Sequence, residues 1–175
     1  WRLHGRMTMT TNTTMGSLNG KVAVITGAGS GFGREFARIA AAEGMALVLV
    51  DVQTDALAET VAELEGTDIL QRTLDVTDGA AMDALAADAF TRFGAVHLLF
   101  NNAGVGSTGL MWEATTRDWE WVLGVNLWGT IHGVRAFVPR MLGVARTDPT
   151  YSGRVINTAS MAGLIDPPLM GPYNV

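Results

Sequence analysis

The sequence contains no cysteine, a modest share of charged residues and no long apolar run. Without cysteine, disulfides, thiolate zinc sites and cysteine nucleophiles are excluded. No apolar run approaches the roughly 20 residues that cross a bilayer, so no membrane partner is expected. The 12 basic and 17 acidic residues leave a formal net charge of −5, which argues against a nucleic-acid partner. The histidines show no metal-ligand spacing, and no metal site is expected.

The composition is that of a folded domain. Hydrophobic residues make up 48% of the 175 residues and charged residues 17%, which excludes a disordered chain. Residues 1–14 are polar and rich in threonine, so we expect residues 1–17 to form a disordered or tag-like leader. The length then predicts a single domain over residues 18–175.

Short β-branched runs alternate with helical stretches from Lys21 onward. Strands are predicted over 22–25, 46–50, 68–74, 97–100 and 154–158, and helices over 31–43, 54–65, 78–93 and 118–142. The first helix carries Phe32, Phe36, Ile39 and Ala40 at helical spacing. This alternation requires right-handed crossovers, so it predicts an α/β fold with a doubly wound parallel sheet, the Rossmann fold.

A glycine-rich turn separates the first strand from the first helix. It reads Thr26-Gly27-Ala28-Gly29-Ser30-Gly31-Phe32-Gly33. Glycines at such a turn allow a pyrophosphate to approach the backbone, and the amides at the helix start hold its oxygens. A P-loop is excluded because no Lys-Ser or Lys-Thr follows the last glycine. The predicted cofactor-binding residues of the turn are Thr26, Gly27, Ser30, Gly31, Phe32 and Gly33, although glycines alone are also compatible with a purely structural turn.

Asp51 supplies the second half of the pattern. It lies at the end of the second predicted strand, 24 residues after Gly27, where a carboxylate accepts hydrogen bonds from the ribose hydroxyls of an adenosine. The same carboxylate repels a 2′-phosphate. Residues 52–58 contain no basic residue, and Arg34 and Arg38 are expected to point down the helix. The sequence therefore predicts NAD as the cofactor, with NADP less favoured.

These motifs, in this order, resemble the classical short-chain dehydrogenase/reductase family. The glycine spacing Thr26 to Gly33 fits the family pattern T-G-x-x-x-G-x-G. Asp75-Val76 stand where the family holds the adenine ring, and Asn101-Asn102-Ala103-Gly104 resemble the N-N-A-G motif of the cofactor floor. The resemblance extends from Lys21 to Tyr173 and adds Asp75, Val76, Asn102, Ala103 and Gly104 to the expected cofactor-binding residues.

The resemblance also implies catalytic residues. Asn126 matches the helix asparagine that holds a proton-relay water, and Ser160 and Tyr173 match the catalytic serine and tyrosine. Ser160 would orient the substrate oxygen and Tyr173 would act as general acid and base. An unperturbed tyrosine has a pKa of about 10, and the family lowers it with a lysine four residues later. That lysine would be residue 177, so we expect a partial chain with five of about seven strands, cut inside the catalytic motif and inactive by itself.

Three functions are compatible with these residues. The first is an NAD-dependent oxidoreductase that interconverts a secondary alcohol and a ketone. The second is a non-catalytic NAD-binding sensor or scaffold, which has no need of Asn126, Ser160 and Tyr173 together. The third is a structural fragment that binds no cofactor. The resemblance implies a small-molecule substrate and a homo-oligomer, a tetramer or dimer, and we expect a cytoplasmic protein.

Overall fold

A computed structural model describes residues 16–175, so the predicted leader lies almost wholly outside the described residues. The elements, in chain order, are β1 (Val22–Thr26), α1 (Gly31–Ala42), β2 (Ala46–Asp51), α2 (Thr54–Ala62), β3 (Ile69–Thr73), α3 (Gly79–Phe93), β4 (Leu98–Asn101), α4 (Thr116–Leu123), the π-helical turn η1 (Gly124–Trp128), α5 (Gly129–Thr147), β5 (Arg154–Asn157), α6 (Ala162–Ile165) and α7 (Gly171–Asn174).

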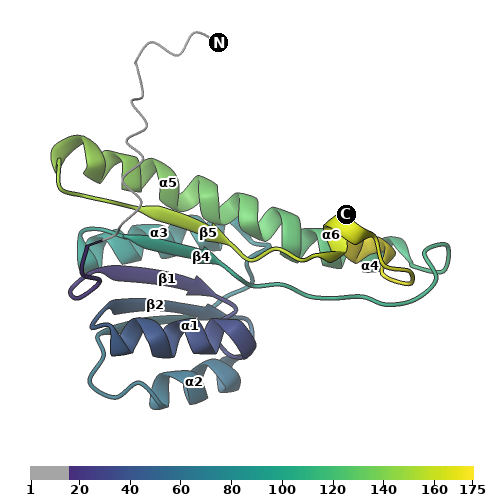
Figure 1. Cartoon of the computed structure of the whole chain (residues 1–175), viewed down its shortest axis with the longest axis horizontal. Coiled ribbons are helices and arrows are strands. Elements are labelled where there is room, and N and C mark those ends of the chain that lie inside the picture. The colour runs from purple at the N-terminus through teal and green to yellow at the C-terminus, as the bar shows by residue number, and fades with distance from the viewer. Residues whose placement is uncertain (1–15) are drawn as a thin grey trace, which may run out of the picture.

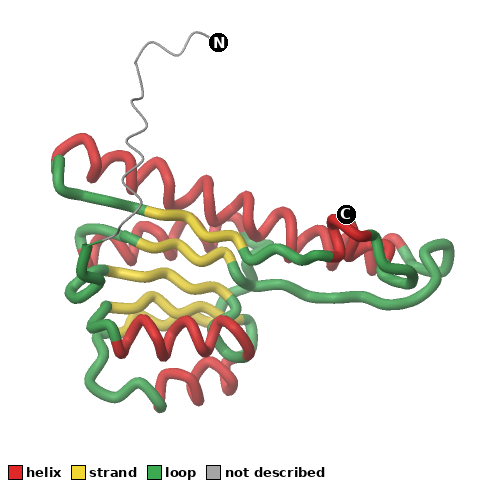
Figure 2. Tube along the Cα trace, viewed as in Figure 1, coloured by secondary structure: helices red, strands yellow, loops and turns green. Residues whose placement is uncertain are grey.

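The five strands form one parallel sheet in the order β3-β2-β1-β4-β5. Figure 2 shows the strands side by side with the helices around them. The chain moves outward from β1 in one direction through β2 and β3, then returns to the other side of β1 for β4 and β5. This is a doubly wound sheet, and the predicted Rossmann-type fold is confirmed.

Strand periodicity divides the core between the two faces of the sheet. In β1, Val22 and Val24 pack with α3 and α5, whereas Ala23 and Ile25 pack with α1 and α2. The central strands are buried on both sides because successive side chains point to opposite faces and each face carries helices. Figure 1 shows α1 and α2 on one face and α5 on the other.

Helix α1 approaches the sheet through small residues. Gly33, Ala37 and Ala40 are buried, whereas Phe32 and Ile39 are 70% and 60% exposed. The apolar residues predicted to share one stripe are therefore only partly buried. Small side chains bring the helix close to β1 and leave no space for larger ones. Phe36 lies at the margin, where its ring stacks on Phe100 with centroids 4.9 Å apart.

The long helix predicted over 118–142 has different bounds and a different interior. It begins at Thr116, because Thr115 and Asp118 form a capping box, and it runs to Thr147. A π-helical turn over Gly124–Trp128 separates α4 from α5. One residue more per turn shifts the helix face there, and hydrophobic periodicity alone did not predict that shift.

The segment after β4 and the segment after β5 extend together beyond the sheet (Figure 1). An isolated parallel bridge joins Gly109 to Met170, and the Gly109 N–H donates to the Leu169 carbonyl at 2.8 Å. The short helices α6 and α7 of this extension were not predicted from the sequence. Within residues 16–175, no helix combines the length and apolar character needed to cross a membrane.

We expect His97 to make the folding stability depend on pH. Its Nδ1 accepts the Val22 N–H at 3.1 Å, and burial, reinforced by the charge of Lys21, lowers the pKa of His97. The unfolded chain therefore binds the proton first, so stability is full above the ordinary histidine pKa of about 6.5 and falls as the pH drops below it. We expect urea unfolding to give a lower free energy at pH 5.5 than at pH 7.5. His97→Gln should flatten this dependence; an equal loss in both proteins would contradict it.

Candidate active site

The predicted cofactor-binding residues lie at or beside the carboxyl edge of the sheet. All strands are parallel, so β1, β2, β4 and β5 end at the same edge. The direction of winding reverses between β1 and β4, and doubly wound sheets bind ligands in the crevice at this point. Thr26 ends β1 and Asn101 ends β4, one on each side of the crevice.

Thr26 and Asn102 join the two sides of this crevice. The Thr26 hydroxyl oxygen accepts the N–H groups of Asn102 and Ala103, both at 3.0 Å. The Asn102 Nδ2 donates to the Thr26 carbonyl at 3.1 Å, and its Oδ1 accepts the Thr158 hydroxyl at 2.9 Å. Three strand ends, of β1, β4 and β5, are thus fixed by one asparagine and one threonine.

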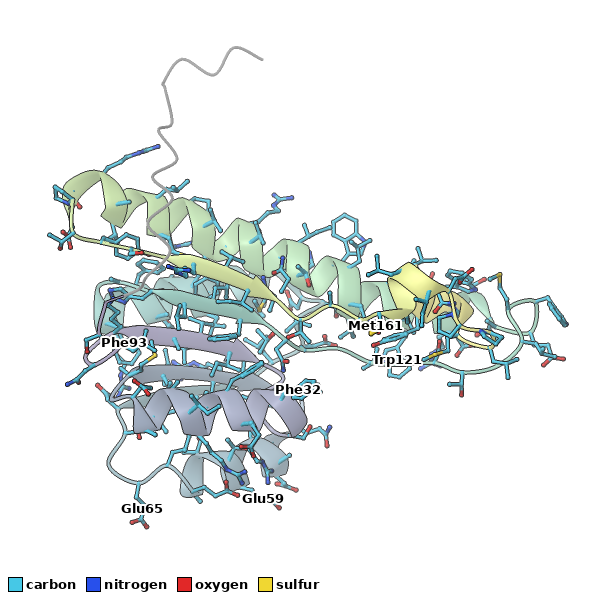
Figure 3. All side chains as sticks on the ribbon, in the orientation of Figure 1. Phe32, Glu59, Glu65, Phe93, Trp121 and Met161 are labelled. Atoms are coloured by element: carbon cyan, nitrogen blue, oxygen red, sulfur yellow. The ribbon has the colours of Figure 1, made fainter. Side chains whose placement is uncertain are left out.

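The glycine-rich turn packs tightly against both neighbours. Gly27 has a φ of +67°, and a Cβ there would lie 2.9 Å from the Ala103 Cα. The N–H groups of Gly31, Phe32 and Gly33 open α1 without partners inside the helix, and the first turn holds no acidic residue. An open pocket of about 560 Å³ lies here, lined by Ser30, Gly31, Phe32, Arg34 and Glu35. Figure 3 shows Phe32 at this end of α1.

Gly33 is the position where the turn tolerates no side chain. A Cβ at Gly33 would lie 2.0 Å from the Gly27 carbonyl oxygen, a backbone atom that cannot move aside. We expect Gly33→Ala to lower the free energy of unfolding by about 3 kcal/mol, since overpacking shifts the backbone. Urea unfolding measures this. Gly143→Ala in α5 is the control, because nothing lies within 4 Å of its Cβ position, and it should not destabilise. Equal stability of the two variants would contradict the packing described.

Asp51 is held in one orientation by two backbone amides. Its Oδ2 accepts the Gly29 N–H at 2.8 Å and its Oδ1 accepts the Gln53 N–H at 2.9 Å. The residue is 9% exposed. Each carboxylate oxygen keeps further acceptor capacity, because an ionised carboxylate has about four lone-pair sites. A preoriented acceptor therefore stands beside the glycine-rich turn.

The expectation that Arg34 points down the helix is wrong. Its guanidinium turns back toward the glycine-rich turn, where Nη2 donates to the Gly29 carbonyl at 2.7 Å. Arg38 pairs instead with Glu35 and Glu63 on the outer surface. The difference arises because the Gly29 carbonyl and the carboxylates of α2 offer Arg34 acceptors that a view of α1 alone does not include.

Asp75 and Val76 follow β3. The Asp75 carboxylate is exposed and accepts the Thr77 N–H at 2.9 Å, whereas Val76 is 7% exposed. The Val76 carbonyl lies 3.0 Å from His132 Nδ1, so this ring nitrogen carries the hydrogen that it donates. Gly129 gives Val76 its space, because a Cβ there would lie 2.7 Å from Val76 Cγ2. Helix α5 thus fixes the segment that the resemblance assigns to the adenine.

Asn126 lies in the π-helical turn and holds the segment after β4. Its Oδ1 accepts the Val105 N–H and its Nδ2 donates to the Val105 carbonyl, both at 2.9 Å. Gly104 lies alongside, with its Cβ position 3.5 Å from Asn126 Oδ1. π-Helical turns are frequent at functional sites. The observed contact of the Asn126 side chain is with backbone, and the proton-relay role stays a prediction.

Ser160 and Tyr173 lie in the extension beyond β5. The Ser160 Oγ accepts the Ala162 N–H at 3.1 Å, which leaves the hydroxyl hydrogen free to be donated. Tyr173 lies on α7 and is half-buried. Helix α6 starts two residues after Ser160 and packs against α7, and this contact brings the two segments together.

The family is identified by a match that covers the whole stretch of chain that forms this edge of the sheet. Residues 21–175 match the family model described as short chain dehydrogenase. The chain belongs to the short-chain dehydrogenase/reductase family. The resemblance predicted from the sequence is thereby confirmed.

Several dehydrogenases are similar to this chain in sequence, and two of them in solved structure. A short-chain dehydrogenase/reductase from Burkholderia phymatum, crystallised in complex with NAD, is 54% identical, with a TM-score of 0.86, over 91% of this chain and 56% of that one. An NAD⁺-bound xylitol dehydrogenase is 34% identical, with a TM-score of 0.83, over 90% of this chain and 60% of that one. A CLA biosynthesis dehydrogenase/reductase from Lactiplantibacillus plantarum is 39% identical over 88% of this chain and 53% of its own length. The chain thus spans little more than half the length of these relatives.

Among the predicted site residues, the glycine-rich turn, Asp51 and Asn102 are joined by hydrogen bonds or close packing. Asp75 and Asn126 are fixed through backbone partners of their own. Sequence reasoning missed Thr60, a fully buried threonine of α2 that bonds to the turn. No motif marks it, since a threonine inside a helix is common in any fold.

Proposed function

We propose that this protein is an NAD-dependent oxidoreductase that interconverts a secondary alcohol and a ketone. The observation that carries this most is the fixed Asp51 carboxylate beside the glycine-rich turn. It favours NAD over NADP, because a 2′-phosphate would meet a buried, oriented negative charge. The NAD complexes of the relatives from Burkholderia phymatum and of xylitol dehydrogenase agree with this cofactor.

The residues present fit a dinucleotide. Ser30, Gly31 and Phe32 are exposed where the turn leads into α1, and the first amides of α1 suit a pyrophosphate. Asp51 would hold the adenosine ribose, and Asp75 and Val76 the adenine. Asn102, Ala103 and Gly104 would form the floor beneath the nicotinamide half. When bound, the oxidised cofactor would accept the hydride and the reduced cofactor would donate it.

Ser160 and Tyr173 would act on the substrate oxygen. Because Ser160 Oγ already accepts the Ala162 N–H, its hydroxyl hydrogen is available to donate to that oxygen and orient it. Reduction of a ketone places negative charge on the oxygen, and the Tyr173 hydroxyl would protonate it; in oxidation the same oxygen of Tyr173 would accept the alcohol proton. Asn126 would hold the proton-relay water that the family uses.

Two experiments test this function. The first measures the rate at which the protein as encoded forms NADH from NAD with each of a panel of secondary alcohols. This rate should depend on which alcohol is supplied. The second measures NAD binding, and binding with no turnover on any alcohol or ketone would instead favour a sensor or scaffold.

We further propose that the protein forms a homo-oligomer. The outer side of η1 and α5 exposes large apolar residues, with Leu127, Trp128 and Leu142 each about half exposed at 49%, 50% and 49%. Burying such residues against a second copy is favourable at about 25 cal/mol per Å² of apolar surface. Light scattering on the protein as encoded should give a mass at least twice that of one chain, and a monomer at all concentrations would refute this arrangement.

A further inference from the structure

Ala28 and Gly29 lie at the centre of the glycine-rich turn, and their backbone groups bond to other parts of the chain. The Ala28 N–H donates to the Val50 carbonyl at 2.9 Å, and the Ala28 carbonyl accepts the Thr60 hydroxyl at 3.0 Å. The Gly29 N–H donates to Asp51 Oδ2 at 2.8 Å, and the Gly29 carbonyl accepts Arg34 Nη2 at 2.7 Å. All four backbone polar groups of these two residues therefore have protein partners, and the orientation of each peptide is fixed.

Arg34 and Thr60 act on this segment as a pair. The Arg34 Nε lies 3.0 Å from Thr60 Oγ1, so Arg34 donates to the hydroxyl and the hydroxyl in turn donates to the Ala28 carbonyl. Thr60 is fully buried, and the Arg34 side chain is 22% exposed. The guanidinium holds the Gly29 carbonyl directly and the Ala28 carbonyl through Thr60. This requires its fork of donors, which a lysine does not have.

Two carboxylates hold the guanidinium in this place, one on α2 and one on the residue that caps its C-terminus. Glu59 lies 3.2 Å and Glu63 lies 3.6 Å from its nitrogens. Figure 3 shows Glu59 on α2, on the same side of the sheet as α1. These carboxylates are largely exposed, so the ion pairs contribute little energy, but they direct the cation toward α2 and the turn.

We propose that Arg34 is a positioning residue for the dinucleotide. By holding the Gly29 carbonyl it fixes the residue whose N–H orients Asp51, so that the carboxylate meets the ribose without reorganising. The guanidinium is also bonded to the Gly29 carbonyl and to Thr60, and it is therefore not available to a 2′-phosphate. This role depends on the NAD binding proposed above.

The test compares Arg34→Gln with Arg38→Gln in the protein as encoded, using calorimetric titration with NAD and with NADP. We expect Arg34→Gln to raise the Kd for NAD about tenfold or more, as for loss of hydrogen bonds from a charged donor. Arg34→Lys should recover only part of this. The Kd for NADP should change less, and kcat at saturating NAD should stay within about twofold, because the change lies in binding. Arg38→Gln, one turn further along α1, should bind NAD like the wild type.

A double-mutant cycle distinguishes positioning from general support of the fold. In an Asp51→Asn background, Arg34→Gln should cost less than about threefold, because the route through Asp51 is already lost. An undiminished loss in that background, or a Kd for Arg34→Gln within twofold of the wild type, would overturn the role. If Arg34→Gln does not fold, Thr60→Val tests the same segment: it removes the hydrogen bond to the Ala28 carbonyl, which belongs to the peptide that carries the Gly29 N–H, and it should also raise the Kd for NAD. Absence of NAD binding by the wild type would overturn the proposed function itself, and this role with it.

Discussion

In Tyr173→Phe, turnover of secondary alcohol falls by at least about 100-fold and up to about 10⁴-fold, while the Kd for NAD stays within about twofold. The variant keeps the aromatic ring at this position of α7 and removes only the hydroxyl that would exchange the proton with substrate. General acid–base catalysis contributes about 10² to 10⁴ in rate, which sets the size of the loss. Steady-state kinetics and NAD titration on the protein as encoded measure the two quantities separately.

Tyr151→Phe is the matched control, because Tyr151 is the other tyrosine of the chain. Its hydroxyl donates to the Val96 carbonyl at the opposite end of the sheet, and burial raises the pKa of Tyr151 to about 12. Its loss should lower stability by about 1 kcal/mol and leave kcat unchanged. Equal turnover by the two variants would show that the Tyr173 hydroxyl takes no part in the reaction.

Asp51→Asn should raise the Kd for NAD by about tenfold to a hundredfold, with a smaller change in the Kd for NADP. The amide loses the charge that strengthens bonds from the ribose hydroxyls, each worth about 1.5–3 kcal/mol. It also brings an NH₂ group against one of two backbone donors, since Gly29 and Gln53 both point an N–H at this side chain. The ratio of the Kd for NADP to the Kd for NAD should therefore become smaller, as measured by titration with each cofactor.

Asp55→Asn controls for the removal of negative charge from this region. Asp55 lies exposed in the first turn of α2, four residues from Asp51, and should leave both dissociation constants unchanged. A Kd for NAD that is the same in Asp51→Asn and Asp55→Asn would exclude Asp51 from the cofactor site.

The fold was predictable because its signals are local and repeated. Each central strand is a continuous apolar run, as Val22–Thr26 illustrates, and each is followed by a helical stretch. The bounds of most elements came within a few residues of the structure. The π-helical turn at Gly124–Trp128 was not predicted, because a single additional residue in a long helix leaves the apolar pattern on either side intact.

The site could be predicted only where the type of a residue itself indicates the backbone conformation or the end of a strand. Glycines mark the turn and Asp51 marks a strand end, so both could be read from spacing. Thr60 and Arg34 could not, because their partners are carbonyls brought close by packing of α2 on the turn, and a carbonyl is present at every residue. The direction assigned to Arg34 was wrong for the same reason.

The most direct measurement is calorimetric titration of the protein as encoded with NAD and, separately, with NADP. A preoriented carboxylate beside a glycine-rich turn predicts that NAD binds, and that it binds at least about tenfold more tightly than NADP. Heat from neither coenzyme, or tighter binding of NADP, would contradict the role assigned to this edge of the sheet.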